Sequence, residues 1–231
     1  MNVPVVRVVA VTGTDTGVGK TVVTAAIAAG QRSLGRSVAV VKPAQTGVGP
    51  HEDGDLAEVR RLAGEVSVHE GVRLPDPLAP DTAARVAGRD LPSLEDQRNL
   101  VSTAARESDV TLVEGSGGVL VNLGVQWNLL DLAEALERTG HEVAFVVVAR
   151  AGLGTLNHTA LTVQAIRARG LMVEGVAIGS WPAHPDLAAE QNLVDLPFLT
   201  GVPLIGRIPE GADRLPVPDF RRRALEWLPV P

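Results

Sequence analysis

The chain has 231 residues, of which 45% are hydrophobic, with a formal net charge of −6 and no cysteine. This length and apolar content suit one α/β domain over residues 1–231. The acidic balance argues against nucleic acid or an anionic membrane as partner, and the lack of cysteine excludes disulfides and thiolate chemistry. No apolar run is long enough to span a bilayer and no signal-peptide pattern opens the chain, so a cytoplasmic protein is expected.

The first predicted unit is a strand, a glycine-rich loop and a helix. Residues 5–11 are an apolar run typical of a buried strand, and residues 22–29 are small and aliphatic, as in a packed helix. The loop between them ends in Gly19, Lys20 and Thr21. In such a loop backbone amides surround phosphate oxygens, the lysine reaches the β- and γ-phosphates, and the hydroxyl binds Mg²⁺. The pattern predicts a phosphate-binding loop.

The glycine spacing of this loop differs from the usual one, and two other interpretations of the loop are weaker. Five residues separate Gly13 from Gly19, one more than in the usual loop, so either the loop is longer or Gly17 makes the close approach to phosphate. A dinucleotide fingerprint would need glycine where Val22 stands, and an acidic residue where the second strand ends in Lys42. A chance glycine turn does not explain the strand before the loop or the Lys-Thr pair after it.

The second predicted strand, residues 37–41, ends in Lys42, which is followed by proline. Because proline cannot continue a hydrogen-bonded ladder, Lys42 is expected at the carboxyl edge of the strand, where ligands bind in open α/β sheets. Residues 44–55 are glycine-rich and acidic, which predicts a functional or mobile loop. Apolar residues recur at helical spacing over 56–63, so Asp55 lies at a helix start, where a capping role is the alternative to a functional one.

The middle of the chain predicts a strand that ends in a carboxylate. Less regular patterns precede it and predict an extended piece over 68–74 and helices over 82–87 and 94–106. The strand, residues 110–113, ends in Glu114, whose carboxylate reaches the sheet edge of the glycine loop and suits Mg²⁺ or an ordered water. The small residues Gly115, Ser116 and Gly117 follow, and they let a ligand pass close to the backbone. A solvated strand-end glutamate is the alternative.

The rest of the chain continues to alternate between helices and strands. The pattern predicts helices over 127–138, 159–169 and 187–199, and strands over 142–148, 173–178 and 203–206. A glycine-containing loop before residue 159 is a second candidate anion site at a helix N-terminus, whereas the lone His158 in it suits a structural role. Together the segments predict a doubly wound, mostly parallel α/β sheet.

Five separated motifs of this chain occur together in one known family. They are residues 12–21, residues 42–47, Asp55, residues 113–118 and residues 154–158. These motifs resemble the dethiobiotin synthetase family of the P-loop class over nearly the whole chain, and the longer glycine spacing is also this family's habit. The resemblance implies that ATP, carbon dioxide and 7,8-diaminononanoate (diaminopelargonate) give dethiobiotin, ADP and phosphate. One amine forms a carbamate, the γ-phosphoryl group moves to it as a carbamic-phosphoric anhydride, and the second amine closes the ring.

The resemblance also implies roles for individual residues. Lys20 and Lys42 are the implied catalytic residues, because the carbamate and the γ-phosphate are both anionic and have to be neutralised. Thr21, Asp55 and Glu114 are the implied shell of Mg²⁺. The implied ATP-binding residues follow the loops at the sheet edge: Gly17, Val18, Gly19, Lys20, Thr21, Val22, Asp55, Glu114, Gly115, Ser116, Gly117, Gly179, Ser180, Ile208, Pro209 and Glu210.

The family works as a homodimer, so the resemblance implies a substrate site shared by two subunits. Thr14 and Thr46, beside Lys42, are implied to hydrogen-bond the diamine end of the substrate. The carboxylate of the substrate tail is implied to bind the partner subunit at a helix N-terminus. The residues matching that tail site are Gly152, Gly154, Thr155, Leu156 and Asn157.

Two departures from the family pattern lead to further expectations. Relatives place an Asn-Asp pair that reads adenine where this chain has Gly179 and Ser180, so base discrimination is expected to be weak, with CTP or GTP also serving. Residues 79–81 are Ala-Pro-Asp in place of the family's Ser-Pro-His and are assigned no role. The alternative function is a nucleotide switch of the partitioning-ATPase type, although such proteins usually carry a second lysine at the position of Asp15.

Overall fold

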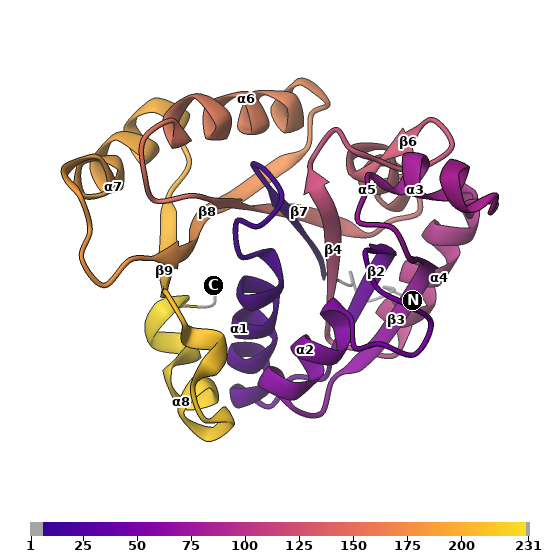
Figure 1. The fold of residues 1–231 in the computed structure, drawn as a ribbon, viewed down its shortest axis with the longest axis horizontal. Coiled ribbons are helices and arrows are strands. Elements are labelled where there is room, and N and C mark those ends of the chain that lie inside the picture. The colour runs from indigo at the N-terminus through magenta and orange to yellow at the C-terminus, as the bar shows by residue number, and fades with distance from the viewer. Residues whose placement is uncertain (1–6, 230–231) are drawn as a thin grey trace.

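The computed structural model describes residues 7–229, and within them seven strands form one parallel sheet (Figure 1). The strand order is β3-β2-β4-β1-β7-β8-β9. The strands are β1 (Arg7–Gly13), β2 (Val38–Thr46), β3 (Ser67–Leu74), β4 (Val110–Gly118), β7 (Glu142–Ala149), β8 (Met172–Trp181) and β9 (Leu204–Pro209). A two-stranded antiparallel sheet consists of β5 (Asn122–Gly124) and β6 (Trp127–Asn128). Residues 5 and 6 of the first predicted strand lie outside the described residues.

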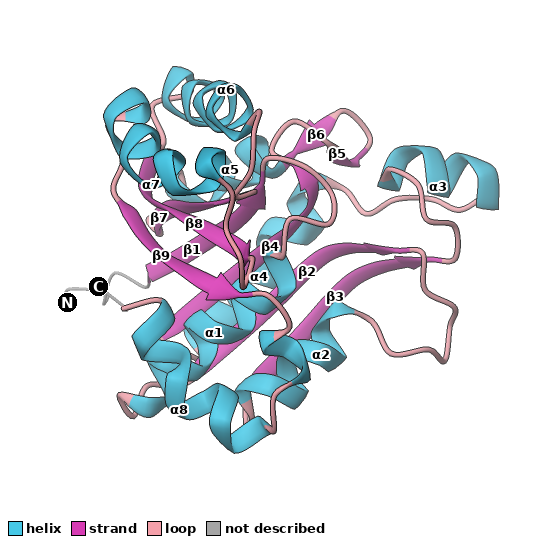
Figure 2. Ribbon diagram, turned by 60° about the vertical axis from the view of Figure 1, so that its left-hand side comes forward, coloured by secondary structure: helices cyan, strands magenta, loops and turns pink. Residues whose placement is uncertain are grey.

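Helices cover both faces of the seven-stranded sheet, as Figure 2 shows. The helices that share a core with one face are α1 (Lys20–Ser33), α2 (Asp55–Ala63) and α8 (Val217–Trp227). Those that share a core with the other face are α3 (Pro80–Ala87), α4 (Leu94–Arg106), α5 (Leu129–Glu137) and α6 (Thr155–Ala168). The last long helix, α7 (Leu187–Thr200), packs against α6 and β9, and a 3-10 turn, η1 (Ala212–Arg214), precedes α8. The predicted doubly wound α/β fold is confirmed.

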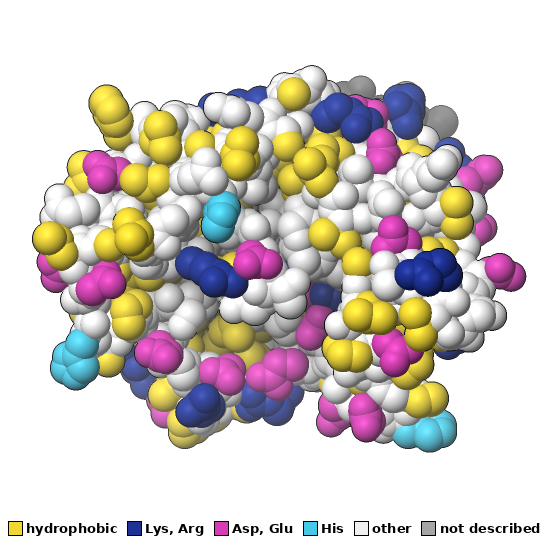
Figure 3. Space-filling view, turned by 45° about the horizontal axis from the view of Figure 1, so that its top comes forward, with side chains coloured by type: hydrophobic (Ala, Val, Ile, Leu, Met, Phe, Trp, Pro, Cys, Tyr) yellow, Lys and Arg dark blue, Asp and Glu magenta, His cyan; other side chains and the backbone are white. Residues whose placement is uncertain are grey.

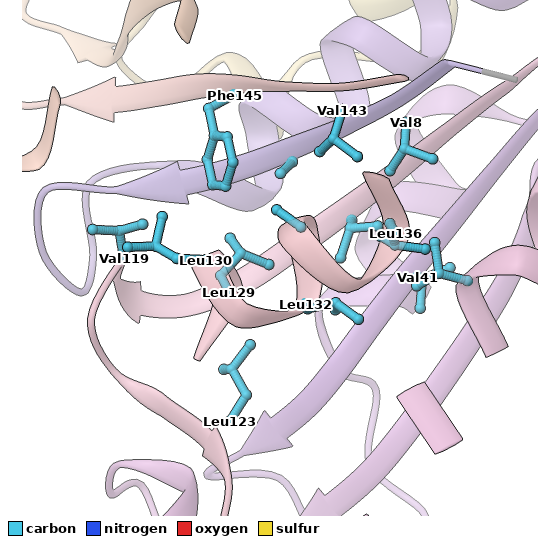
Figure 4. Close-up of a cluster of buried hydrophobic side chains, with 14 of the residues drawn as sticks. Val8, Val41, Val119, Leu123, Leu129, Leu130, Leu132, Leu136, Val143 and Phe145 are labelled. Carbon is cyan, nitrogen blue, oxygen red and sulfur yellow. The ribbon is translucent and has the colours of Figure 1, made fainter. Parts of the chain in front are cut away.

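Burial on both faces explains why the strands are continuous apolar runs. In β1, Val9 and Val11 belong to the core that contains α1, whereas Val8 and Ala10 belong to the core that contains α5. Figure 4 shows the second core, where α5 lies over strands β1, β2 and β7. Its labelled side chains include Val8, Val41, Val143 and Phe145 from the strands and Leu129, Leu130, Leu132 and Leu136 from α5.

Small residues hold α1 close to the sheet. Ala25, Ala26 and Ala28 have no exposed surface, and Ala29 is also buried. Because α1 directly follows the glycine loop, this close packing also fixes the loop above the carboxyl end of β1. β1 itself is paired on both sides, with β4 and β7. In open α/β sheets the crevice beside such a central strand is where ligands bind.

Lys42 is not the last residue of its strand, contrary to the prediction. β2 continues through Pro43 to Thr46. The paired register of β2 with β4 ends at Val41, and beyond it β2 pairs only with β3. The ladder with β4 has therefore ended before the proline is reached, so the proline does not terminate the strand.

Other boundaries also differ from the predicted ones. The helix expected from residue 127 begins at Leu129, because Trp127 pairs with Gly124 in the small sheet and Asn128 caps the helix in a capping box with Asp131. α6 begins at Thr155, four residues before its predicted start, after Gly154 in a left-handed conformation. β4 and β8 run on into the segments predicted as loops. No helix within residues 7–229 has the length and apolar character needed to cross a membrane.

Candidate nucleotide and catalytic site

The loop between β1 and α1 has the backbone conformation that its glycines predict. Gly17 and Gly19 have φ angles of +72° and +94°, in the left-handed region that favours glycine. Val18 between them is buried. α1 begins at Lys20, and no side chain caps its first turn. The amides at this helix start therefore remain suited to binding an anion.

A cleft of about 810 Å³ opens beside this loop at the carboxyl edge of the sheet, a size that suits a nucleotide-sized ligand. It brings together residues from α1, β2, α2 and β4 that are far apart in sequence. The predicted site residues that line it are Gly17, Gly19, Lys20, Thr21, Val22, Lys42, Thr46, Asp55, Glu114, Ser116 and Gly117. The other lining residues are Thr16, Gln45, Val48, Pro77, Leu78, Ala79, Pro80 and Val121.

The ammonium group of Lys42 is the centre of the charged cluster. Its Nζ lies 2.7 Å from Asp55 Oδ2 and 2.8 Å from Glu114 Oε1, and it donates to the Gly115 carbonyl at 3.2 Å. Burial alone would lower the pKa of Lys42, but the carboxylates of Glu114 and Asp55 outweigh burial and raise this pKa above its usual value. Lys42 is therefore a charged donor at neutral pH.

Lys20 lies in a different electrostatic environment. Its Nζ donates to the Asp15 carbonyl at 2.9 Å. Burial, and then repulsion by the Lys42 ammonium, lower the pKa of Lys20 from 10.5 to about 8. Lys20 and Lys42 are also the only two lysines of the 231-residue sequence. All the side-chain amines of the chain are thus gathered in this cleft.

The oxygen atoms around Lys42 fit a magnesium ion. Thr21 Oγ1 donates to Glu114 Oε1 at 3.0 Å, and the other carboxylate oxygen of Glu114 is buried without a hydrogen-bond partner. Asp55 is the first residue of α2, after the N-cap Gly54, and its carboxylate contacts Lys42. Hydroxyl and carboxylate oxygens are the ligands that Mg²⁺ prefers. Within residues 7–229, no group of three or more His, Cys, Asp or Glu is placed to hold a metal.

Three predicted residues lie beside the cleft without lining it. Thr14 donates its backbone amide to the Val148 carbonyl at 2.9 Å, which joins the loop to β7. Val18 is buried under the loop, and Gly115 contributes the carbonyl that Lys42 contacts. Ser116, which does line the cleft, donates Oγ to the Ala44 carbonyl at 2.6 Å and so ties the end of β4 to β2.

The residues predicted to read the nucleobase lie on the other side of the loop. Gly179, in β8, packs so tightly beneath the loop that a Cβ there would overlap the Val18 carbonyl. Ser180 is exposed and offers only a hydroxyl. In β9, Ile208 is buried and Pro209 is half-buried. The Glu210 amide donates to the Trp181 carbonyl at 2.8 Å, which links the ends of β8 and β9.

The residues predicted to bind the substrate tail do not line the cleft of their own chain. Gly152, Gly154 and Asn157 lie at the start of α6, and nothing lies within 4 Å of a Cβ built on either glycine. Thr155 is buried, and Leu156 packs against the small core under α7. The loop therefore presents open backbone to the outside, as a site for another molecule requires.

Sequence reasoning missed several lining residues. Gln45 belongs to the motif at residues 42–47 but received no role, and residues 77–80 fall in the segment with weak periodicity. Val121 follows the glycines after Glu114. The ion pair of Asp15 with Arg150, at 2.7 Å across the mouth of the loop, was also missed. No local pattern signals these residues, because tertiary contacts bring them to the cleft.

Known proteins similar to this chain agree in name. A family model described as "AAA domain" matches residues 7–214. The ATP-dependent dethiobiotin synthetase BioD of Rhodococcus jostii is 52% identical over 95% of this chain and 94% of that protein. The protein of the same name from Streptomyces coelicolor is 51% identical over 97% of this chain and 92% of that protein. That of Mycobacterium sp. (strain KMS) is 45% identical over 93% of each chain.

Solved structures with the same fold are more distant in sequence. A ParA family ATPase from Chlorobium tepidum superposes with a TM-score of 0.56 at 16% identity, covering 95% of this chain and 92% of that chain. The cell division ATPase MinD from Pyrococcus furiosus gives a TM-score of 0.54 at 18% identity, covering 94% and 88%. At such low identity the likeness is one of fold alone.

Proposed function

The chain belongs to the ATP-dependent dethiobiotin synthetase family, and from this premise we propose how its residues divide the work of the reaction. It is a P-loop ligase of biotin biosynthesis that uses ATP to form dethiobiotin. One observation supports the division of roles: two ammonium groups and two carboxylates from separate elements meet in one cleft beside the glycine loop.

The nucleotide end of the cleft is assigned to the glycine loop and Lys20. The free amides at the start of α1 hold the phosphates, and the Lys20 ammonium neutralises the γ-phosphate. Thr21, Asp55 and Glu114 would hold Mg²⁺, which would neutralise charge on the nucleotide phosphates when bound. The unpartnered buried oxygen of Glu114 supports this assignment, because a buried carboxylate oxygen needs a donor or a cation.

Lys42 is assigned to the carbamate. Its ammonium group lies in the same cleft as that of Lys20, so it can donate to a carbamate oxygen while Lys20 holds the phosphate. Thr46 lines the same cleft and is assigned to the diamine end of the substrate, with Thr14 beside it. Fixing two anionic groups next to each other is the main task of the site, because phosphoryl transfer depends on positioning and charge stabilisation.

The tail of the substrate is assigned to the partner subunit of a cytoplasmic homodimer. None of residues 152–157 lines the cleft of its own chain, which supports a site that serves the cleft of a second copy. Leu153 is 94% exposed and Phe198, on α7, is 90% exposed. Figure 3 shows hydrophobic side chains on the left-hand part of the face that carries α6 and α7. Exposed apolar groups in this density suit a protein interface.

The nucleobase is assigned no strong recognition. Because Gly179 has no room for a side chain and Ser180 offers only a hydroxyl, the site provides few groups that distinguish adenine from other bases. Affinity then comes mainly from the triphosphate, so in this proposal CTP and GTP are also used as nucleotide substrates.

Phosphate release tests the proposal directly. The full chain is incubated with ATP, Mg²⁺, diaminopelargonate and bicarbonate, and each component is omitted in turn. We expect release to require both the diamine and bicarbonate and to match the dethiobiotin formed. Release that ignores the diamine would instead favour a nucleotide switch with this fold.

A further inference from the structure

Asp55 is held in the cleft by residues that have no assigned role. It is the first residue of α2, and its side chain is 36% exposed, whereas the side chain of Lys42, its partner at 2.7 Å, is 4% exposed. The loop of residues 47–54 delivers Asp55 to this position. Gly54 before it cannot cap the helix, because glycine has no side chain. Something else has to fix the end of the loop.

Gln45 supplies the missing cap. Its side chain is buried, and its Oε1 accepts the backbone amide of Asp55 at 2.9 Å. Its Nε2 donates to the Thr46 carbonyl at 3.2 Å, so both ends of the side-chain amide are engaged. Gln45 lies on β2 three residues after Lys42, and it therefore ties Asp55 to the strand that carries the ammonium group.

Arg73 fastens the rest of the loop from the neighbouring strand. It pairs with Gln45 in the register of β2 and β3. Its Nη1 donates to the carbonyls of Gly49 and Glu52 at 3.1 and 2.6 Å. Arg73 also donates two hydrogen bonds to the Glu70 carboxylate, at 2.7 and 2.8 Å, and this bidentate contact fixes the plane of the guanidinium.

Gly54 gives these two side chains room to meet. A Cβ on Gly54 would lie 2.8 Å from Gln45 Oε1 and 3.3 Å from Arg73 Nη2. Any larger residue would push the amide of Gln45 off the Asp55 backbone. Gln45, Gly54 and Arg73 thus form one latch on the loop.

We propose that this latch positions the Asp55 carboxylate and thereby sets how tightly the cleft takes the divalent cation with its nucleotide. The inference rests on the proposed function, in which Asp55 is a magnesium ligand. Gln45 and Arg73 contact the Asp55 backbone and the loop before it, so they are assigned as positioning residues. Groups that orient a metal ligand typically change metal affinity by about 10- to 100-fold when they are removed.

The test is the Mg²⁺ dependence of ATP binding, measured by calorimetry on the full chain. Arg73→Lys keeps the positive charge but loses the bidentate hydrogen bonding of the guanidinium. In this variant and in Gln45→Ala, we expect the Mg²⁺ concentration that gives half of its full effect on ATP binding to rise about tenfold. ATP binding in EDTA should stay unchanged, because the glycine loop is intact. Arg98→Ala, which removes an exposed pair with Glu95 on α4, is the control and should leave both readings unchanged.

An Mg²⁺ dependence that stays unchanged in both variants overturns the proposal, as does equal weakening with and without Mg²⁺. Asp55→Asn separates this from a failure of the proposed function. If Asp55→Asn alone leaves the Mg²⁺ response unchanged, the metal role of Asp55 is wrong. If it raises the Mg²⁺ requirement, adding Gln45→Ala to it should cause no further loss. An additive loss means that Gln45 does not act through Asp55.

Discussion

Two regions of the sheet's carboxyl edge differ in how far one chain completes them. At β1, β2 and β4, Lys42 contacts the carboxylates of Asp55 and Glu114 at 2.7 and 2.8 Å, and these groups line a single cleft. At β7, β8 and β9, Leu153 is 94% exposed, Ser180 is exposed, and none of the predicted residues lines that cleft. In the proposed function the chemistry is therefore assembled within the chain, whereas contacts to the substrate tail and the base are left to a partner subunit or a ligand.

Removing Lys42 tests the region at β1, β2 and β4 and should have the largest effect. Lys42→Ala should lower dethiobiotin formation by about 10²- to 10³-fold, because the carbamate loses its only assigned donor. ATP binding should be largely kept, since Lys20 remains. Product formation and calorimetric ATP binding measure the two effects. Turnover close to that of the unchanged chain would refute the role given to Lys42.

A substitution at Leu153, in the region at β7, β8 and β9, should have the next largest effect. Leu153→Glu places a charge on a side chain that is 94% exposed and assigned to the subunit interface. We expect monomers by light scattering and a KM for the diamine raised about 30-fold, because the partner no longer brings a helix N-terminus to the tail carboxylate. Leu34→Glu, which changes another exposed leucine just after α1, is the control. A dimer that persists in Leu153→Glu contradicts the assigned interface.

Gly179 joins the two regions, because it packs beneath the glycine loop. Gly179→Ala should weaken ATP binding about 20-fold, since the new methyl group displaces the Val18 carbonyl and with it the loop. Gly152→Ala adds the same methyl group to open space and should leave ATP affinity unchanged. Normal ATP affinity in Gly179→Ala would mean that the glycine loop can shift to accommodate the methyl group without weakening ATP binding.

The two lysines should respond differently to pH. The free protein sheds the Lys20 proton near pH 8, and bound phosphate favours the charged form, so ATP affinity is fully present below pH 8 and is lost above it. Between pH 7 and pH 9 we expect a loss of about tenfold. NMR of ¹³C-methylated lysines measures each pKa, because the sequence has only two. A Lys20 pKa near 10.5 would contradict the expected loss.

Changing the nucleotide should have the smallest effect. CTP and GTP should support turnover within about fivefold of ATP, because a single hydrogen bond to a base contributes about 1 kcal/mol. A side-by-side assay of dethiobiotin formation at saturating Mg²⁺ measures this. Strict dependence on ATP would show that the region at β7, β8 and β9 reads the base through groups other than the side chains of residues 179 and 180.

The sequence predicts best the features that local chemistry determines. The glycine loop with Lys20 and Thr21 is contiguous, and Glu114 follows an apolar run, so both could be placed near the sheet edge directly, although β4 continues past Glu114 to Gly118. Lys42 was placed at that edge because a proline follows it, yet β2 continues past the proline. It still reaches the cleft, because the pairing with β4 ends at Val41.

Contacts between distant segments could not be predicted. Gln45 has a role only because residues 47–54 fold back so that the Asp55 amide meets it. Gly179 was predicted to lack a recognition group, but its packing against Val18 follows from the approach of β8 to the glycine loop. Such distances depend on how strands and loops meet in three dimensions, and residue spacing along the chain does not encode them.

The position of β1 has a consequence for how the chain is made. β1 is synthesised before both of its sheet neighbours, because Arg7 pairs with Val110 on one side and with Glu142 on the other. During translation this apolar strand therefore remains without sheet neighbours until residues 110–118 of β4 have also left the ribosome. Contacts so distant in sequence slow folding and expose aggregation-prone segments meanwhile. Recombinant yield should consequently respond to growth temperature and to chaperone supply.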